Sequence, residues 1–545
     1  MARPRRPHHR ATPIYLTLAA CLIAGAGVPP VFGSDGDQDG ATEIEPLSEA
    51  QAEVWARVWE EHRGHELIRR FSQRFEPSPL ALVGVAVAPM TGAGLQLDQT
   101  VLVEHGRITA VGPRGEVEVP PEATLVAGAD KFVIPGLTEA HSHTISSLSQ
   151  FLVYLTRGVT TLREMDGFPW MLEARRQAAA GELLIPNLYV AGHILSNRAW
   201  DFYMTQVDNP EEAAARVREQ AAAGYDFIKI HNSLPGPIFD SLFEAAAAEG
   251  LDVVGHIPNE IPIVRAVSAG LRTNEHFKGY IFDQTLEVTD QDYVGATRGS
   301  EMWNVPTFAN YHDHLRGAES LEVVTAENSL RFVPRWLRDG WLRQAEQPVD
   351  ELTALRQTIY PKSRRIFLDL WPEVTRKFVA GTDTGTYAMM VPGFALQEEV
   401  RIFESLGMTP REALETATIN PALAMRREAE FGTIEVGKRA DLVVLEANPL
   451  ESTEHLREIF GVAVRGTWLG PGALEEIRSA VELAFSESTQ VPEPSRAELA
   501  RLVTEMERLS RRAFPYPDYV LSEVGEFLTD LGQADLASRV ADLRR

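Results

Sequence analysis

Two histidines separated by one residue, His141 and His143, are the side chains of this sequence whose types and spacing most clearly suggest metal chemistry. Side chains at positions i and i+2 project from the same face of a β-strand. Both imidazoles can therefore bind one ion if that face lines a cavity. The pair predicts part of a metal site.

Four further residues with suitable chemistry stand at the ends of other predicted strands: Lys229, His256, His276 and Asp383. A lone histidine at a strand end is more often a hydrogen-bonded structural residue than a ligand, so each position alone is weak evidence. In a barrel, however, the carboxyl ends of the strands converge on one pocket, and residues distant in sequence become neighbours. Together the four positions strengthen the metal hypothesis.

Lys229 lies within the apolar segment 227–230. Burial of an ammonium group is costly, so we expect the pKa of Lys229 to fall below its usual value. A neutral amine can add carbon dioxide to form a carbamate, whose two oxygens can bridge two divalent cations. Lys229 therefore has the chemistry to bridge two ions.

The elements that must position these residues follow Pro135, where short apolar strands alternate with helical segments, as in a parallel sheet. Eight strands are expected, and that number favours a closed barrel. They centre on residues 137–143, 159–163, 188–192, 227–230, 253–256, 272–276, 303–308 and 378–383. Residues 309–376 are too long for a single crossover and are predicted to be inserted helices, with a lid as one interpretation.

The segments on either side of the barrel predict a second unit. Residues 80–136 show short strands with hairpin turns, and the β pattern returns in residues 425–472, so a β-sandwich could close from both sides of the barrel. The barrel is predicted over residues 137–424, a linker with an N-terminal helix over 34–79, and a helical tail over 473–545. The tail is expected to pack on the body or to form a dimer surface, which leaves a homo-oligomer open.

Residues 1–33 have the layout of a signal peptide. Arginines among the first ten residues precede an apolar stretch that is too short for a confident membrane span. The only cysteine is Cys21, so a cleaved chain would have neither a disulfide nor a thiol nucleophile. Residues 18–21 also resemble a bacterial lipobox, in which case a lipid on Cys21 would tether the protein to a membrane. We expect an exported protein, periplasmic or extracellular, with ordinary cleavage favoured.

Charge and motif content argue against several other classes. The formal net charge of −25 disfavours nucleic acid as a partner. Residues 432–438 fit the spacing of a phosphate-binding loop, but Arg439 replaces the Ser or Thr that would bind magnesium. No G-x-S-x-G occurs, which removes the main support for a serine hydrolase with a nucleophile elbow. A second H-x-H, His312 and His314, is interpreted as part of a loop, with a contact to substrate as the alternative.

Four segments in combination resemble the amidohydrolase superfamily, and in particular its imidazolonepropionase-like and prolidase-like branch. They are PGLTEAHSH at 135–143, RGVTTLR at 157–163, GTD at 381–383 and GTIEVGKRADL at 432–442. The resemblance covers roughly residues 80–470. It implies an α/β fold: a (β/α)8 TIM barrel with a composite β-sandwich formed by the flanking segments. The expected N- and C-terminal helical extensions fall outside the resemblance.

The resemblance also implies a ligand set and cofactors. Lys229 would be carboxylated and would bridge two divalent ions, with zinc favoured. The remaining ligands would divide between the ions: His141, His143 and Asp383 on one, His256 and His276 on the other.

The sequence departs from the pattern of the superfamily at two positions. Glu139 stands where Asp is more common, which could alter ligand orientation without removing a ligand. His231 stands where Tyr is frequent, and strand alternation would direct it into the cavity of Lys229. It is either a contact to substrate or oxyanion, or a hydrogen-bonded structural histidine. Arg163 and His193, near strand ends, are weaker candidates for substrate contacts.

These observations predict an exported binuclear metal-dependent amidohydrolase. It would cleave an amide-type C–N bond of a small molecule, such as a dipeptide or an N-acyl amino acid, by a metal-bridged hydroxide with Asp383 as general base. One alternative is a mononuclear hydrolase or deaminase acting on a cyclic amide, lactone or related ring. Another is an exported binding protein that kept the fold and lost turnover, although the filled ligand positions favour an enzyme.

Overall fold

The computed structural model describes residues 65–75, 77–143, 148–198, 204–282, 287–311, 328–345, 351–374, 376–385, 390–487, 528–529 and 533–542. Several predicted features lie outside these residues. They are the signal peptide with Cys21, the linker and helix up to residue 64, His312 and His314, and most of the tail beyond residue 487.

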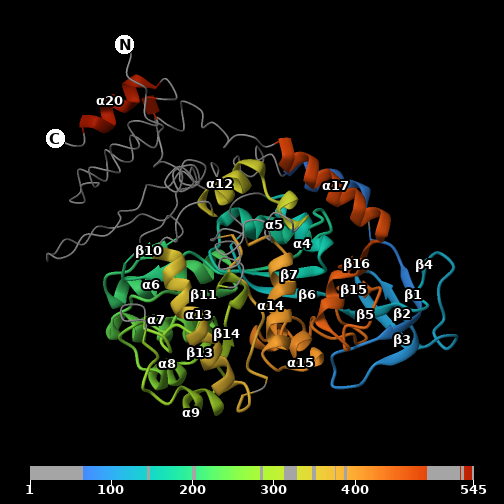
Figure 1. The fold of residues 1–545 in the computed structure, drawn as a ribbon, viewed down its shortest axis with the longest axis horizontal. Helices are drawn as coiled ribbons and strands as arrows, with labels where there is room; N and C mark the ends of the chain where they lie inside the picture. Colours follow the sequence, from blue (N-terminus) through green and yellow to red (C-terminus); the bar gives the residue numbers. More distant parts are fainter. Residues whose placement is uncertain are drawn as a thin grey trace.

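One eight-stranded sheet combines strands from two distant parts of the chain (Figure 1). Its first part contains β1 (Leu80–Val87), β2 (Gln96–Glu104), β3 (Arg107–Pro113), β4 (Thr124–Ala127) and β5 (Phe132–Pro135), and its second part contains β15 (Leu442–Leu445), β16 (Ile459–Val464) and β17 (Thr467–Leu469). The strand order is β17-β16-β15-β5-β1-β2-β3, with β4 beside β1. Antiparallel pairing of β5 with β15 joins the two parts, with Val133 opposite Val444.

The sheet is stabilised by alternating apolar residues that share one buried cluster. Leu80 and Leu82 of β1 meet Val133 of β5 and Val444 of β15 there. Full burial of each such side chain contributes about 1.5–3 kcal/mol. The pairing of β5 with β15 therefore holds the start and end of the intervening segment together.

Parallel strands form the second architectural unit. A three-stranded sheet contains β6 (Leu137–Ser142), β7 (Val159–Glu164) and β8 (Asn187–Val190). A six-stranded sheet contains β9 (Ile194–Ser196), β10 (Met204–Gln206), β11 (Phe227–Ile230), β12 (Asp252–Gly255), β13 (Leu271–Glu275) and β14 (Trp303–Val305), in the order β10-β9-β11-β12-β13-β14. Isolated parallel bridges connect Ala191 with Phe227, Asn304 with Phe378, and Ser142 with Thr384.

The predicted strand at residues 378–383 differs from the other seven. It forms isolated bridges at its ends instead of a continuous ladder. The backbone N–H of Thr382 donates to the side chain of Glu139 at 2.9 Å, and Asp383 adopts a φ of 66°. Both features interrupt regular strand pairing. The N–H of Thr382 is no longer available to a neighbouring strand, and the φ of Asp383 lies outside the β region.

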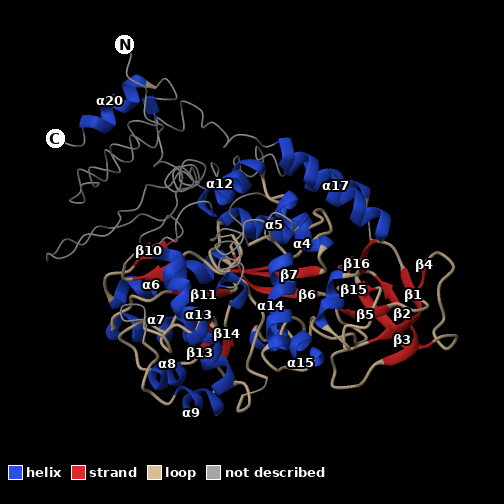
Figure 2. Cartoon of the chain, in the orientation of Figure 1, coloured by secondary structure: helices blue, strands red, loops and turns tan. Residues whose placement is uncertain are grey.

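Helices cover the outside of the parallel strands (Figure 2). Those that follow strands are α4 (Gln150–Thr156), α5 (Pro169–Ala179), α6 (Pro210–Ala223), α7 (Gly236–Glu249), α8 (Ile263–Ala269), α9 (Tyr293–Arg298) and α14 (Phe394–Ser405). Local sequence sets their ends. The side chain of Asn209 caps α6 by accepting from the N–H of Glu212, and Gly224 ends the helix at a φ of 88°.

The short helix α15 (Pro410–Glu415) begins after Thr409. Thr409 and Glu412 form a capping box, in which each side chain accepts from the backbone N–H of the other residue. The short helix α16 (Ile419–Ala424) follows, and η2 (Thr453–Arg457) lies between β15 and β16.

The described parts of the predicted insertion are helical: η1 (Asn328–Phe332), α12 (Arg335–Ala345) and α13 (Glu351–Leu370). Phe367 of α13 packs against Phe378 and Phe403, with ring centroids 4.8 and 5.6 Å away. This part of α13 therefore belongs to the hydrophobic core.

Helices also lie beyond the two units: α3 (His65–Arg74), α17 (Pro471–Glu487) and α20 (Ala534–Asp542). Arg74 of α3 pairs with Glu476 of α17 at 2.8 Å. Among the described residues, no helix has both the length and the apolar character needed to cross a membrane.

Candidate metal centre

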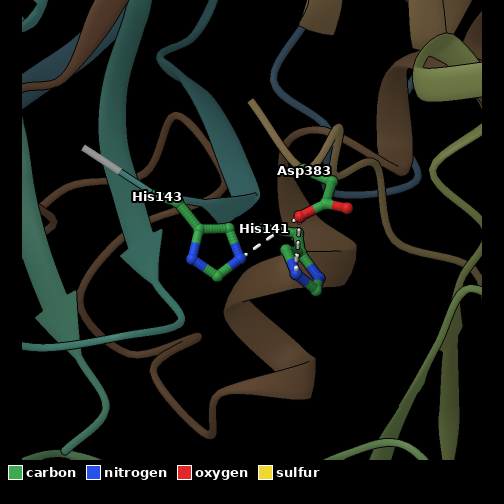
Figure 3. A group of neighbouring side chains, drawn as sticks. All are labelled: His141, His143 and Asp383. Atoms are coloured by element: carbon green, nitrogen blue, oxygen red, sulfur yellow. Dashed lines mark ion pairs between the residues drawn. The ribbon is translucent and has the colours of Figure 1, made fainter. Parts of the chain in front are cut away.

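His141, His143 and Asp383 come together at the carboxyl ends of the parallel strands (Figure 3). Each offers one ligand atom, and these atoms lie within 4.8 Å of one another. The Oδ1 atom of Asp383 is 3.4 Å from Nε2 of His141 and 3.2 Å from Nε2 of His143. The structure thus groups three of the six predicted ligands around one carboxylate oxygen.

Backbone contacts fix Asp383 beside β6. The N–H of Asp383 donates to the carbonyl of His141, and the N–H of His143 donates to the carbonyl of Thr384, both at 2.8 Å. Gly381 permits this approach, because a Cβ at that position would lie 2.9 Å from the backbone nitrogen of His141. Steric crowding therefore explains why glycine occupies the first position of the G-T-D segment.

His276 and His256 extend the group. Nε2 of His276 lies 3.9 Å from Oδ2 of Asp383, and its ring centroid is 4.6 Å from that of His141. The ring centroid of His256 lies 5.1 Å from that of His276. The two oxygens of Asp383 therefore face different histidines, with His141 and His143 on one side and His276 on the other.

The imidazoles of His141 and His143 are held from behind by carboxylates. Nδ1 of His141 is 2.8 Å from Oε2 of Glu275, and Nδ1 of His143 is 2.8 Å from Oδ1 of Asp166. Engagement of Nδ1 fixes the ring orientation and leaves Nε2 for an ion, the arrangement usual for histidine ligands.

His256 and His276 use Nδ1 in the same way but with neutral partners. Nδ1 of His256 is hydrogen-bonded to Oδ1 of Asn232, and Nδ1 of His276 lies 2.7 Å from Oγ1 of Thr307. All four histidines therefore keep Nε2 free of these contacts.

The four partners were missed from the sequence. Each lies at or within two residues of the carboxyl end of a parallel strand, so its position carried a usable signal, but polar residues at such ends are common. They are Asp166 after β7, Asn232 after β11, Glu275 at the end of β13 and Thr307 after β14.

The charges of the site suit a divalent cation. Burial alone would raise the pKa of Asp383, but His276, His143 and His141 hold it well below its usual value, so the carboxylate is ionised. Burial lowers the pKa of His143, yet Asp166 and Asp383 outweigh it and raise that pKa to about 10. A proton therefore binds readily between His143 and Asp383. A cation would compete with this proton for the same lone pairs.

The other three histidines are neutral at pH 7, which is the form that binds metals. Burial and the charge of Lys229 lower the pKa of His141 to about 4. Burial also holds the pKa values of His256 and His276 well below the usual value. The donor set and its protonation therefore fit a metal ion.

Lys229 is buried on β11, with 1% of its surface exposed. Burial lowers its pKa to about 8, although Glu275 and Asp383 oppose the shift. Roughly a tenth of such an amine is neutral at pH 7. The direction agrees with the expectation from its apolar strand.

Glu139 fastens the first strand to the G-T-D segment. Its Oε1 accepts from the N–H groups of His141 and Thr382, and its Oε2 accepts from the hydroxyl of Thr382 at 2.7 Å. Burial raises the pKa of Glu139 to about 8. The departure from Asp at this position therefore acts on the backbone that carries His141.

Arg163 lies behind the site. It donates to the carbonyl of Ala140 at 2.6 Å, to Oε1 of Glu275 at 2.8 Å and to the hydroxyl of Thr273 at 3.2 Å. These bonds place Arg163 as a support for Glu275 and hence for His141. They favour this role over the predicted contact with substrate.

The two remaining predicted residues lie near the histidines. The ring centroid of His231 is 4.1 Å from that of His256, and burial holds its pKa well below the usual value. His193 packs edge-on against Phe168 at 5.7 Å, and burial lowers its pKa while Asp166 opposes the shift. A contact of either residue with substrate stays a prediction.

Buried histidines and a carboxylate gathered at the ends of parallel strands define a metal-dependent hydrolase. More specifically, the chain belongs to the amidohydrolase family, whose sequence pattern matches residues 132–470. This result confirms the resemblance to the superfamily and supports action on C–N bonds.

Individual relatives and solved structures agree with this family assignment. The chain is 23% identical over 387 residues to an imidazolonepropionase of Alkaliphilus oremlandii (strain OhILAs), covering 66% of this chain and 86% of the relative. It is similar in structure to bottromycin amidohydrolase, with a TM-score of 0.64, 23% identity and coverage of 79% and 94%. A putative prolidase from Bifidobacterium longum gives a TM-score of 0.59 at 25% identity, with coverage of 75% and 100%. These neighbours indicate a TIM-barrel-type fold with mixed helices and strands.

Proposed function

We propose that this protein hydrolyses an amide-type C–N bond of a small molecule with two divalent ions, zinc being favoured. One observation carries the proposal: Nε2 of His141 and of His143 both face Oδ1 of Asp383, while their Nδ1 atoms are engaged by carboxylates. His256 and His276 would hold the second ion. Lys229, as a carbamate, would lie between the two.

We also propose a more specific fold than the TIM-barrel type. We infer that the parallel strands close into a complete (β/α)8 barrel and that the composite sheet is the sandwich domain of the superfamily. The bridges from β8 to β11, from β14 to residue 378 and from residue 384 to β6 support closure, because they link successive strands in a ring.

The chemistry assigns a role to each side chain. Bound metal ions supply a water of lowered pKa and polarise the scissile carbonyl. Asp383, ionised and facing the histidines, would accept a proton from the attacking water and return it to the leaving nitrogen. Glu275 and Asp166 would hold the imidazoles still during this transfer. His231, beside His256, would contact the substrate.

The proposed substrate class is a dipeptide or an N-acyl amino acid. Structural relatives include prolidases and a Xaa-Pro dipeptidase, which supports this choice. A second candidate is hydrolysis or deamination of a ring, which is supported by similarity to imidazolonepropionases and to adenine deaminases. Lys229 favours the first candidate, because members of the superfamily without this lysine usually hold one metal.

The test is a screen of the zinc-loaded protein with metal content measured on the same sample. Xaa-Pro dipeptides, N-acyl amino acids and cyclic amides form the panel. We expect two zinc ions per chain and turnover of a linear amide. Turnover of a cyclic amide alone would favour the second candidate, and protein without tightly bound metal or turnover would favour the binding-protein alternative.

Lys229→Ala tests the bridging role. We expect activity to fall by about 10³-fold or more, since the group between the ions is lost, with the thermal melting curve preserved. Lys377→Ala is the matched control, because Lys377 is a half-buried lysine that lies over the ring of Trp303. Unchanged turnover in the Lys229 variant would rule out the carbamate.

A further inference from the structure

The turn that follows β14 carries two residues that contact the proposed metal ligands. Oγ1 of Thr307 lies 2.7 Å from Nδ1 of His276, and Nδ2 of Asn310 donates to Oδ2 of Asp383 at 2.9 Å. Asn310 is only 3% exposed. One short turn therefore supports His276 and the carboxylate toward which His141 and His143 are directed.

A carboxylate from a distant helix holds this turn. Glu399 of α14 is fully buried, and its Oε1 and Oε2 accept from the backbone N–H groups of Phe308 and Ala309 at 3.0 and 2.6 Å. N–H groups at the start of a helical turn lack partners within it, so a carboxylate there both satisfies and orients them. Glu399 thus fixes the backbone from which Asn310 projects.

The backbone is strained on both sides of the contact between Asn310 and Asp383 and needs such support. Thr307 has a φ of 54° and Asp383 a φ of 66°. Left-handed values are uncommon outside glycine and are a genuine outlier for a β-branched residue such as Thr307. Strained residues of this kind persist only where the surrounding structure holds them, and they concentrate at functional sites.

We propose that Asn310 is a positioning residue for Asp383 and that Glu399 is its anchor. The amide of Asn310 holds Oδ2, which keeps Oδ1 turned toward Nε2 of His141 and His143. Without this donor Oδ2 would lose one of the contacts that orient the carboxylate, so both metal binding and proton transfer would have a less fixed geometry. The kinetic part of this inference rests on the proposed function, whereas the metal-binding part concerns only Asp383 as a ligand.

The first experiment measures the zinc affinity of the full chain by competition with a chromophoric chelator. Asn310→Ala and Asn310→Leu both remove the donor, and the second keeps the volume of the side chain. We expect zinc binding to weaken about 10–100-fold in both, the range typical for partners of metal ligands. On a linear amide substrate, kcat should fall by a similar factor with little change in KM.

Glu398 provides a matched control for Glu399. It is a neighbouring buried glutamate on the same helix, and it pairs with Arg401 and Arg457. Glu399→Gln should weaken zinc binding about tenfold, because one acceptor oxygen becomes a donor, while Glu398→Gln should leave zinc affinity unchanged. If Glu399→Gln does not fold, Glu399→Asp, which keeps the charge and shortens the side chain, replaces it.

A double variant distinguishes the anchor from a general structural role. If Glu399 acts through Asn310, Glu399→Gln combined with Asn310→Ala should bind zinc no more weakly than Asn310→Ala alone. Additive losses would overturn the anchor, and zinc affinity within twofold of the unmodified chain in both Asn310 variants would overturn the positioning role. Failure of the unmodified chain to cleave any amide would instead contradict the proposed function and leave the zinc measurements decisive for this inference.

Discussion

The two pairs of histidines in the proposed two-ion centre are supported by different chemistry. Glu275 and Asp166, both fully buried carboxylates, stand behind His141 and His143. A side-chain amide and a hydroxyl stand behind His256 and His276. A carboxylate makes an imidazole a stronger donor as well as orienting it, whereas a neutral partner mainly orients it.

This difference implies that the proposed two-ion centre would have unequal halves. The half built on β6 has charged support and a direct contact with Oδ1 of Asp383, while the half built on β12 and β13 has neutral support and lies 3.9 Å from Oδ2. We expect the first half to bind its ion more tightly.

The largest effect is expected from Asp383→Ala, because Asp383 faces both halves. Activity should fall by about 10³- to 10⁴-fold, since the proposed general base and a ligand are lost together. Steady-state kinetics and zinc content would be measured on the same sample. Loss of one ion with full activity would contradict the shared role.

Glu275→Gln should lower the free energy of unfolding by about 3 kcal/mol, because Arg163 is left buried without its charged partner. Urea denaturation of the metal-free protein measures this loss. Glu373→Gln is the control, since the side chains of Glu373 and its partner Arg298 are 47% and 56% exposed and their pair is open to solvent. Equal stability of the two variants would contradict a structural role for the pair formed by Arg163 and Glu275.

Asp166→Asn and Asn232→Ala compare the two kinds of support directly. We expect zinc affinity to fall about 10–100-fold for Asp166→Asn and about tenfold or less for Asn232→Ala. Chelator competition gives both values. If the losses are equal, the charge of the partner does not distinguish the halves.

The smallest effect should be a difference in release rate between the two ions. On addition of a chelator we expect two phases, with the ion held by His256 and His276 leaving first. Asp166→Asn should bring the phases closer together, because it weakens the tighter half. A single phase in the unmodified chain would contradict the expected difference in affinity between the two halves.

The sequence predicted the strand framework better than the contacts between strands. Seven predicted strands appear as β6, β7, β8, β11, β12, β13 and β14, because their apolar character and turn signals are local. The segment at 378–383 was less regular than expected, since Thr382 bonds to Glu139 and Asp383 has a positive φ. Pairing of Val133 with Val444 across the sheet depends on residues more than 300 positions apart, so local patterns could not fix its register.

Local patterns in the sequence were enough to identify the side chains that could bind a metal and to place His141 and His143 on one face, because strand alternation is a property of neighbouring residues. Burial of Lys229 in an apolar strand was also local information. Folding of the whole chain brings Glu275 to His141, Asp166 to His143, and Asn310 to Asp383, and no local pattern indicated these contacts. Those contacts join side chains from different strands and turns, whose relative positions are set by the packing of the whole fold.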